Sequence, residues 1–298
     1  MTFTGFGEVL LAPDAPAWLD HLNATIPETW KIFTTNGTPL RGEIVERLLK
    51  SRYVVQLSLH AADSALHEEL TGLKGAFQGI VRSLGELCSL RRERDLGDRL
   101  HVVLVSVVTR RSAGSLADLV RLAWELKVPE VQCHYVTVFN EAHIPQSCFF
   151  DQERANEAIA AAQEALDRIR SGADPEEAKH FQVSLPPRFG AGQDSRAGSV
   201  CPEPWEHVYV EAQGPVLPCC QWGEHIGNLD AGDDLDALWN GPFYRGFRSS
   251  MASGDPHPWC GRCARYRGYN VDNLLCHLTN RPEQQKALLE AIGTWTRA

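Results

Sequence analysis

Cysteines with metal-ligand spacing concentrate in the last third of the chain. Six of the nine cysteines follow residue 200. Cys260 and Cys263 form a CxxC turn, a spacing that brings two thiolates onto one metal centre. Cys201 and the adjacent Cys219 and Cys220 precede that turn. The spacing predicts a metal site with four thiolates, one of them from the 219/220 pair. Zinc and an iron–sulfur cluster both accept four thiolates, so the ligand type leaves both metals open.

Local structure must bring these cysteines together. Residues 208–210 and 216–217 fit two short strands, and Gln213 and Gly214 fit the turn of a hairpin between them. Residues 233–248 carry their large apolar side chains near one face of a predicted helix, which is typical of a helix packed on a core. Four tryptophans surround the cysteines in the sequence and are expected to pack the same small module: Trp205, Trp222, Trp239 and Trp259.

The other cysteines belong to different surroundings. Cys88 lies in an apolar helical pattern and Cys133 in an apolar strand, so both are predicted to be core residues. The positions of Cys148 and Cys276 leave their roles open.

The first 185 residues alternate short β-rich runs with longer amphipathic stretches, which indicates parallel βα units. A parallel sheet or a barrel covered by helices is therefore expected, and one strand reads as an almost continuous apolar run. The predicted strands are residues 2–5, 31–35, 53–59, 100–108 and 130–138, and the predicted helices are residues 15–22, 41–49, 77–88, 115–126 and 151–169.

The composition changes from residue 171 to residue 199, where Pro, Gly and small polar residues accumulate. We predict a first domain over residues 1–185, a linker over residues 186–198 and a cysteine-rich second domain over residues 199–298. Asn140, Glu141 and His143 follow a predicted strand of the first domain, where barrel enzymes place reactive groups.

Charge and hydropathy exclude several classes of protein. The net charge of -9 argues against a nucleic-acid-binding surface, which needs clustered Lys and Arg. No stretch approaches the ~20 apolar residues that a membrane-spanning helix requires. An odd number of cysteines without a secretory signal fits a reducing compartment, so we expect a cytoplasmic protein with no membrane or nucleic-acid partner.

The segment from Cys201 to Cys263 resembles the SPASM domain, which closes many radical S-adenosylmethionine enzymes. The resemblance rests on Cys201, twelve residues, Gly214, four residues and Cys219, and on the later CxxC turn. The further cysteines of the full SPASM pattern do not follow that turn, so the similarity implies one auxiliary 4Fe-4S cluster, as in SPASM/twitch domains. Its implied ligands are Cys201, Cys219, Cys260 and Cys263, with Cys220 as the alternative to Cys219.

The first domain is similar to the radical S-adenosylmethionine partial barrel entered at its second strand. Gly5, Phe6, Gly7 and Glu8 resemble the loop that contacts the methionine amino group of S-adenosylmethionine, and glycines there let the backbone approach closely. The same resemblance places Asn36 and Ser58 at the cofactor. Asn36 belongs to Thr34-Thr35-Asn36-Gly37 at the end of the family's third strand, and Ser58 belongs to Leu57-Ser58-Leu59 at the end of the fourth.

The family's CxxxCxxC loop, whose three thiolates bind the cluster that activates the cofactor, does not occur in these 298 residues. The resemblance then implies a partial barrel without its first βα unit. We interpret the chain as a fragment or a mis-started form of a longer enzyme. In this form it is not expected to cleave S-adenosylmethionine.

The resemblance implies an enzyme that modifies a peptide or a small molecule by hydrogen abstraction, with flavodoxin or ferredoxin as a possible reductant. The cofactor carries the difficult chemistry and the protein positions it. Two alternatives stay open. One is a degenerate, non-catalytic cluster protein that acts in electron transfer or as a scaffold, and the other is a structural zinc module.

Overall fold

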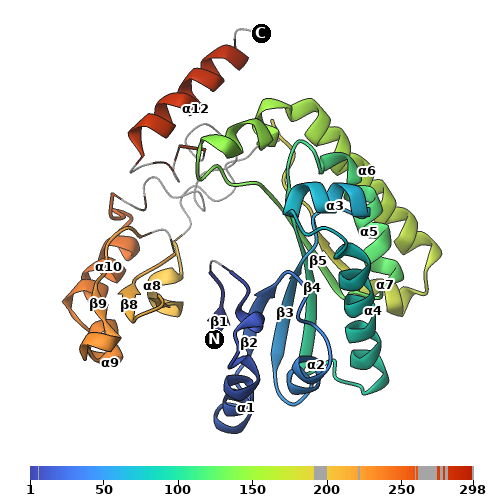
Figure 1. Cartoon of the computed structure of the whole chain (residues 1–298). Coiled ribbons are helices and arrows are strands. Elements are labelled where there is room, and N and C mark those ends of the chain that lie inside the picture. The colour runs from blue at the N-terminus through green and yellow to red at the C-terminus, as the bar shows by residue number, and fades with distance from the viewer. Residues whose placement is uncertain are drawn as a thin grey trace. The chain divides into compact units, whose positions relative to one another are not determined.

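The computed structural model describes residues 1–5, 7–190, 200–220, 222–258, 260, 274–275, 278 and 281–296. The chain divides into two compact units (Figure 1). The first, here called the sheet unit, comprises Met1–Val136 and Pro145–Arg188. The second, here called the cysteine unit, comprises Thr137–Ile144 and Phe189–Ala298. Most of the predicted linker, residues 191–198, lies outside the described residues.

Six parallel strands form the sheet unit and follow one another in chain order across the sheet. They are β1 (Thr2–Phe3), β2 (Lys31–Thr35), β3 (Tyr53–Ser58), β4 (Leu100–Val108), β5 (Glu130–Tyr135) and β6 (Gln182–Ser184). The predicted α/β class is confirmed. The bounds of β2 and β4 agree with the prediction, whereas β5 ends three residues early. Strand β6 was missed, because it is short and polar and lies in the segment assigned by composition to irregular chain.

The helices of the sheet unit lie along one side of the sheet (Figure 1). Right-handed crossovers between parallel strands that advance in one direction give this arrangement. Asp63 caps the unpredicted helix α3 by accepting a hydrogen bond from the Leu66 N–H at 2.9 Å. No helix in the described ranges is long and apolar enough to cross a membrane. The helices are α1 (Ala15–Thr25), α2 (Glu43–Leu48), α3 (Ser64–Thr71), α4 (Phe77–Glu93), α5 (Leu116–Glu125), α6 (Gln152–Gly172) and α7 (Pro175–Lys179), with 3-10 turns η1 (Val9–Leu11), η2 (Ala113–Ser115) and η4 (Cys148–Phe150). The 3-10 turn η3 (Glu141–Gln146) begins in the cysteine unit and ends in the sheet unit.

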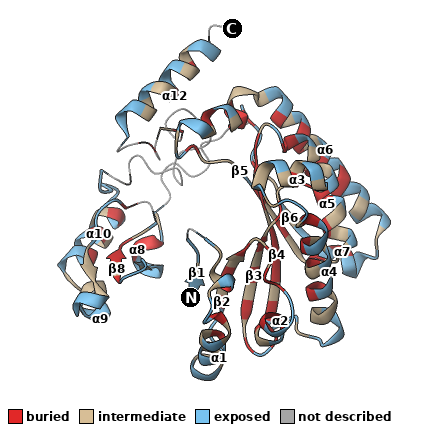
Figure 2. Ribbon diagram, viewed as in Figure 1, coloured by how far each residue is buried: buried red, intermediate tan, exposed pale blue. Residues whose placement is uncertain are grey.

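The two faces of the sheet differ in burial. Residues of one face are fully buried, among them Phe33, Val55, Leu57, Leu104 and Val131 (Figure 2). Side chains that alternate with them in β2, β3 and β5 are only half-buried or exposed. Since successive side chains of a strand point to opposite faces, the apolar face is the one that the helices cover.

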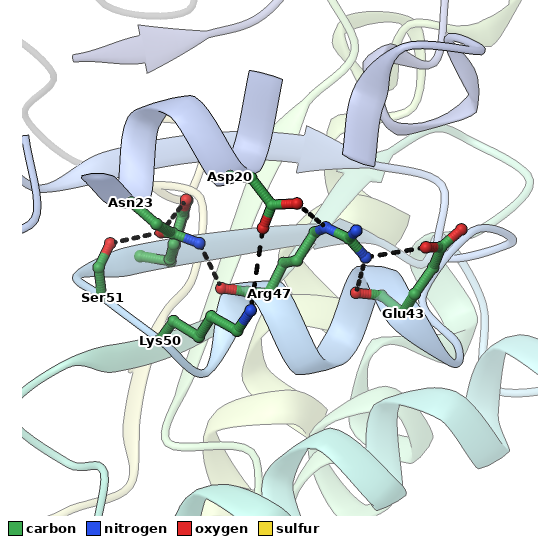
Figure 3. A network of polar contacts seen from close by, with 7 residues as sticks. Asp20, Asn23, Glu43, Arg47, Lys50 and Ser51 are labelled. Atoms are coloured by element: carbon green, nitrogen blue, oxygen red, sulfur yellow. Dashed lines mark hydrogen bonds and ion pairs between the residues drawn. The ribbon is translucent and has the colours of Figure 1, made fainter. Parts of the chain in front are cut away.

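A polar network ties the start of the sheet to its first two helices (Figure 3). The Arg47 guanidinium of α2 pairs with Asp20 of α1 at 3.0 Å and with Glu43 at 2.9 Å. The Asn23 amide donates to the Arg47 carbonyl oxygen at 3.1 Å, and Asn23 Oδ1 accepts from the Tyr53 hydroxyl at 2.7 Å. The network fixes both helices against β3.

The cysteine unit contains a three-stranded antiparallel sheet of β7 (Tyr209–Val210), β8 (Pro215–Leu217) and β9 (Gly227–Asn228). The predicted hairpin is confirmed. The Glu211 N–H donates to the Pro215 carbonyl oxygen, so the loop consists of residues 212–214, in which Gln213 and Gly214 both adopt positive φ, 68° and 87°. A Cβ on Gly214 would lie 2.5 Å from the Asp230 backbone nitrogen, so only glycine fits there.

The single helix predicted over residues 233–248 is wrong. The structure has two helices, α9 (Leu235–Trp239) and α10 (Pro242–Ala252). Gly241 lies between them, where a Cβ would approach the Ala237 carbonyl oxygen at 2.7 Å, and Pro242 starts the second helix. The part of this unit that the structure describes also contains α8 (Glu203–Glu206), η5 (Leu229–Ala231) and α12 (Pro282–Trp295).

Candidate functional site

The loop after β1 meets the loop after β2 at the carboxyl edge of the parallel sheet. Glu8 Oε2 accepts a hydrogen bond from the Asn36 backbone N–H at 2.6 Å, and its other oxygen accepts from the Leu10 N–H at 3.4 Å. Gly5 and Gly7 adopt φ of 147° and 100°, and a Cβ on either would meet no atom within 4 Å. The backbone before Glu8 is therefore accessible, and the carboxylate is held at the strand ends. Phe6 lies outside the described residues.

Asn36 fixes the second loop. Its side-chain oxygen accepts from the Thr38 N–H at 2.9 Å and from the Thr38 hydroxyl at 2.7 Å, which is an Asx turn. A Cβ on the next residue, Gly37, would lie 2.9 Å from Ile80. The Asn36 amide oxygen is thus committed to its own turn, while its backbone N–H holds Glu8.

Ser58 is the last residue of β3 and is half-buried on the less covered face of the sheet. Strands β2 and β3 are parallel, and Thr35 at the end of β2 lies opposite Leu57. Ser58 and the Glu8–Asn36 contact therefore belong to the same, carboxyl edge of the sheet. Their role in cofactor binding stays a prediction.

The less covered face carries a row of polar side chains that sequence reasoning missed. These polar residues recur at every second position of β3 and β5. This alternation was the sequence signal that could have found them, but the strand that contains Cys133 was interpreted as apolar. Registers across β3, β4 and β5 align them: Ser58 lies opposite Val105, and Val105 opposite Gln132. The row consists of Gln56, Ser58, His60, His101, Glu130, Gln132 and His134.

The histidines of this polar face differ in their surroundings. Burial, with a smaller contribution from His67, lowers the pKa of His60 to about 4, so its ring is neutral near pH 7. His60 Nδ1 accepts a hydrogen bond from the Val107 N–H at 3.2 Å, which leaves the proton on Nε2. Burial also lowers the pKa of His134. At the opposite end of these strands, His101 pairs with Glu130 at 2.6 Å.

The candidates after β5 fall in the other unit. Residues 137–144 cluster with the cysteine unit. His143 Nδ1 accepts from the Phe139 N–H at 3.3 Å, and Arg281 donates to the Phe139 carbonyl oxygen at 2.6 Å. Asn140 and Glu141 flank the same turn. These hydrogen bonds hold the turn in place. A catalytic role for Asn140, Glu141 and His143 stays a prediction.

Three of the predicted metal ligands pack against the same cluster of buried residues in the cysteine unit. Cys201, Cys219 and Cys260 pack against one cluster of buried residues, Leu217, Trp222, Phe247 and Met251. Cys219 lies in the bend that follows β8 and is half-buried. Cys220 is exposed. This arrangement favours Cys219 over Cys220 as the ligand.

Polar groups surround these thiols. The pKa of Tyr244 is raised to about 12, mainly by burial, against a lowering by Arg248 and with smaller contributions from Cys219 and Glu203. Burial, with Cys220 and Glu203, raises the pKa of Tyr209, whose hydroxyl lies 3.3 Å from Glu203. Arg248 donates to the Pro204 carbonyl oxygen at 2.8 Å and joins α10 to α8.

The other described cysteines lie in the core of the sheet unit. Cys88, Cys133 and Cys148 are buried in the sheet unit, and burial raises the pKa of each to about 12. The core assignments of Cys88 and Cys133 are confirmed, and Cys148 joins them. Trp222 packs in the cysteine unit as expected, whereas Trp205 is exposed. Cys263, Cys276 and Trp259 lie outside the described residues.

Within the described ranges, no three Cys, His, Asp or Glu side chains lie close enough to hold a metal ion. Three soft thiols from separate stretches nevertheless share one apolar cluster, which fits a thiolate-ligated centre. The full ligand set, including Cys263, stays a prediction.

A family model matches part of the cysteine unit, and one relative aligns with most of the chain. Residues 201–264 match the SPASM family, an iron-sulfur cluster-binding domain. AlbA of Bacillus subtilis (strain 168), an antilisterial bacteriocin subtilosin biosynthesis protein, is 20% identical over 243 residues, which cover 79% of this chain and 48% of AlbA.

Two solved structures resemble the chain closely enough to define its fold. Streptococcus suis SuiB bound to S-adenosylmethionine matches with a TM-score of 0.54 and 19% identity, over 82% of this chain and 55% of SuiB. The protein anSMEcpe with bound AdoMet and Kp18Cys peptide matches with a TM-score of 0.57 and 15% identity, over 100% of this chain and 85% of that chain. The resemblance to radical S-adenosylmethionine enzymes with a SPASM domain is confirmed. The chain spans about half the length of AlbA and SuiB.

Proposed function

We propose that this chain forms the cofactor-binding sheet and the auxiliary-cluster domain of an enzyme that modifies a peptide by hydrogen abstraction. The observation that carries the proposal is the pairing of two features: Glu8 held at the carboxyl edge of the parallel sheet, and three thiols packed on one cluster in a SPASM domain. When bound and reduced, S-adenosylmethionine supplies the radical that abstracts the hydrogen.

The sheet unit contributes a site for the ammonium group of the methionine moiety. The Glu8 carboxylate provides the charge, and the open backbone at Gly5 and Gly7 allows a close approach. The Asn36 N–H restrains Glu8, so little side-chain entropy is lost on binding. Ser58 borders the same edge and can donate or accept one hydrogen bond.

The polar face of the sheet suits a peptide substrate. Gln56 and Gln132 offer amide groups that can pair with a peptide backbone, and neutral His60 can do so through Nε2. A peptide complex is recorded for SuiB, with its precursor peptide SuiA, and for anSMEcpe, with Kp18Cys peptide. These two proteins support a peptide over a small molecule as the substrate of this chain.

The cysteine unit contributes the ligands of an auxiliary 4Fe-4S cluster: Cys201, Cys219, Cys260 and Cys263. Cys220 is exposed and stays outside this set. The apolar cluster of Leu217, Trp222, Phe247 and Met251 limits water at the thiolates. A flavodoxin or ferredoxin is the expected reductant, in the reducing cytoplasm where such thiolates persist.

The proposal is tested by assaying S-adenosylmethionine cleavage under anaerobic, reducing conditions. The 298-residue chain is compared with any longer product of the same gene that carries a CxxxCxxC loop, each with a candidate substrate peptide. The longer product should release 5'-deoxyadenosine and change the mass of the peptide, whereas the 298-residue chain should hold a cluster without cleavage. A CxxxCxxC-containing product that fills its clusters but never cleaves the cofactor would overturn the enzyme and favour an electron-transfer or scaffold protein.

A further inference from the structure

A pocket opens on the cysteine unit beside the packed thiols. It has a volume of about 570 Å³, within the range of small-ligand sites. One wall is a face of α10 that repeats at helical spacing, and the other is the segment 255–258. Trp222 forms part of the lining, and the full lining is Trp222, Pro242, Phe243, Gly246, Phe247, Ser250, Asp255, Pro256, His257 and Pro258.

Aromatic rings form the apolar part of this α10 pocket. The ring centroids of Trp222 and Phe243 are 5.5 Å apart at 88°, and those of Trp222 and Phe247 are 5.1 Å apart at 59°. Phe243 remains 39% exposed, although its neighbours are buried. The ring of His257 lies 4.6 Å from Trp222 on the other wall. An aromatic surface is thus kept open instead of being covered by the unit itself.

Gly246 keeps the pocket open. It sits in the middle of α10, where glycine costs about 1 kcal/mol relative to alanine. A Cβ at this position would meet no atom within 4 Å, so packing does not require glycine. Its φ is not in the left-handed region, so the backbone does not require glycine either. Glycine at position 246 therefore leaves empty the part of the pocket that a side chain would fill.

Asp255 carries the only formal negative charge of the lining, which contains no Lys or Arg. Among the described residues, none makes a hydrogen bond or an ion pair with the Asp255 carboxylate. An aromatic surface with one unpaired carboxylate is complementary to a planar cation, because a guanidinium stacks on rings and pairs with a carboxylate through two N–H groups. The same helix already shows the stacking part of this mode, since Arg248 lies 4.4 Å from the Trp239 ring and 5.1 Å from the Tyr244 ring.

We propose that the α10 pocket binds an arginine side chain of the peptide substrate. The identification of the ligand as part of the substrate rests on the proposed function, but the binding itself does not. Trp222 and Phe247 line the pocket and also belong to the cluster on which Cys201, Cys219 and Cys260 pack. A bound arginine would therefore anchor the peptide one ring away from the auxiliary-cluster ligands.

The test titrates N-acetyl-arginine amide into the cluster-loaded chain by ligand-observed NMR. N-acetyl-citrulline amide, which has the same shape without the charge, is the matched control ligand. Arginine amide should bind about fivefold more tightly than citrulline amide, the size expected of an exposed cation–π contact with an ion pair. Equal affinity for the two ligands would overturn the proposal.

Three variants locate the binding. Gly246→Leu should abolish binding of arginine amide by filling the pocket, whereas Gly246→Ala should preserve it. Asp255→Asn should remove the preference over citrulline amide. Unchanged binding to Gly246→Leu would place the ligand elsewhere and overturn the proposal. The visible cluster absorption of each variant reports on the proposed function separately: an intact spectrum without arginine binding refutes only the pocket, and arginine binding without any iron refutes only the cluster.

Discussion

The sheet unit and the cysteine unit are held together by different physical means. Adjacent strands of the sheet unit bury Val55, Leu57, Leu104 and Val131 under a layer of helices (Figure 2). Among the described residues of the cysteine unit, the strands have two or three residues each, and the thiols pack on the cluster of Leu217, Trp222, Phe247 and Met251. The first unit is stabilised by apolar burial. The second places its cysteines where a larger unit would place further apolar side chains.

This difference predicts that the two units respond to different perturbations. A small module with little apolar core usually needs disulfides or a metal to fold stably. In such modules, metal binding is coupled to folding, so removal of one metal ligand destabilises the whole module. Our account is therefore that the cysteine unit folds around its cluster while the sheet unit folds without it.

The largest expected effect comes from removing one ligand. Cys219→Ser should abolish the cluster and the thermal transition of the cysteine unit, because structural metal binding contributes on the order of 10 kcal/mol in small metal-dependent domains. Cys220→Ser is the matched control, since its side chain is exposed and adjacent in sequence. Iron content and calorimetry are measured on both. Equal iron loss in the two variants would contradict the assignment.

The next prediction removes an apolar side chain from the core of the sheet unit. Leu104 is fully buried in β4, and Leu104→Ala should destabilise the sheet unit by about 3 kcal/mol through a cavity and lost burial. The cluster absorption should remain, because Leu104 belongs to the other unit. Denaturant unfolding followed by hydrogen exchange of the β3 and β4 amides and by visible absorption separates the two transitions. Simultaneous loss of both signals would show that the units do not unfold independently.

His60 gives the sheet unit a dependence on pH. Its pKa in the folded chain, about 4, is below the ordinary value of 6.5. Between these values the unfolded chain binds more protons, so stability falls as pH decreases from 7 towards 4, by up to about 3 kcal/mol. His60→Gln should flatten this dependence while keeping an acceptor for the Val107 N–H. His21→Gln, on the exposed side of α1, should leave the profile as it is in the parent chain.

The smallest effect concerns the cofactor edge. Glu8→Gln should weaken S-adenosylmethionine binding about tenfold, because a charged hydrogen-bond acceptor is replaced by a neutral one. Glu28→Gln is the control. Glu28 is exposed, precedes the amino end of β2 and pairs with Arg52 at 3.1 Å, away from the carboxyl ends of the strands. Calorimetric titration compares the two. A cofactor affinity that does not change in Glu8→Gln would remove Glu8 from the site.

Sequence patterns predicted the elements whose signal is strong and local. Residues 31–35 and 100–108 are β-rich runs bounded by polar chain, and both strands have the predicted bounds. Gln213 and Gly214 predicted the turn of a hairpin because glycine readily adopts the positive φ that such turns need. The Glu8–Asn36 contact joins residues 28 positions apart, and it could be anticipated only through the resemblance to a known family.

Other features depend on tertiary context. The apolar spacing over residues 233–248 predicts one helix, but Gly241 packs against the carbonyl of Ala237 and divides it in two. Strand β6 has too few apolar residues to be recognised, and it forms because β5 offers a free edge. The α10 pocket has no local signature at all, since its walls come from a helix and a separate segment.

Hydrogen exchange of the chain, measured with the cluster assembled and after its removal by an iron chelator, tests the central claim most directly. The account predicts that amides of β8 and α10 lose their protection when the cluster is removed, whereas amides of β3 and β4 keep theirs. Protection that persists in β8 and α10 without iron, or that collapses in both units together, would contradict a cysteine unit folded around its cluster.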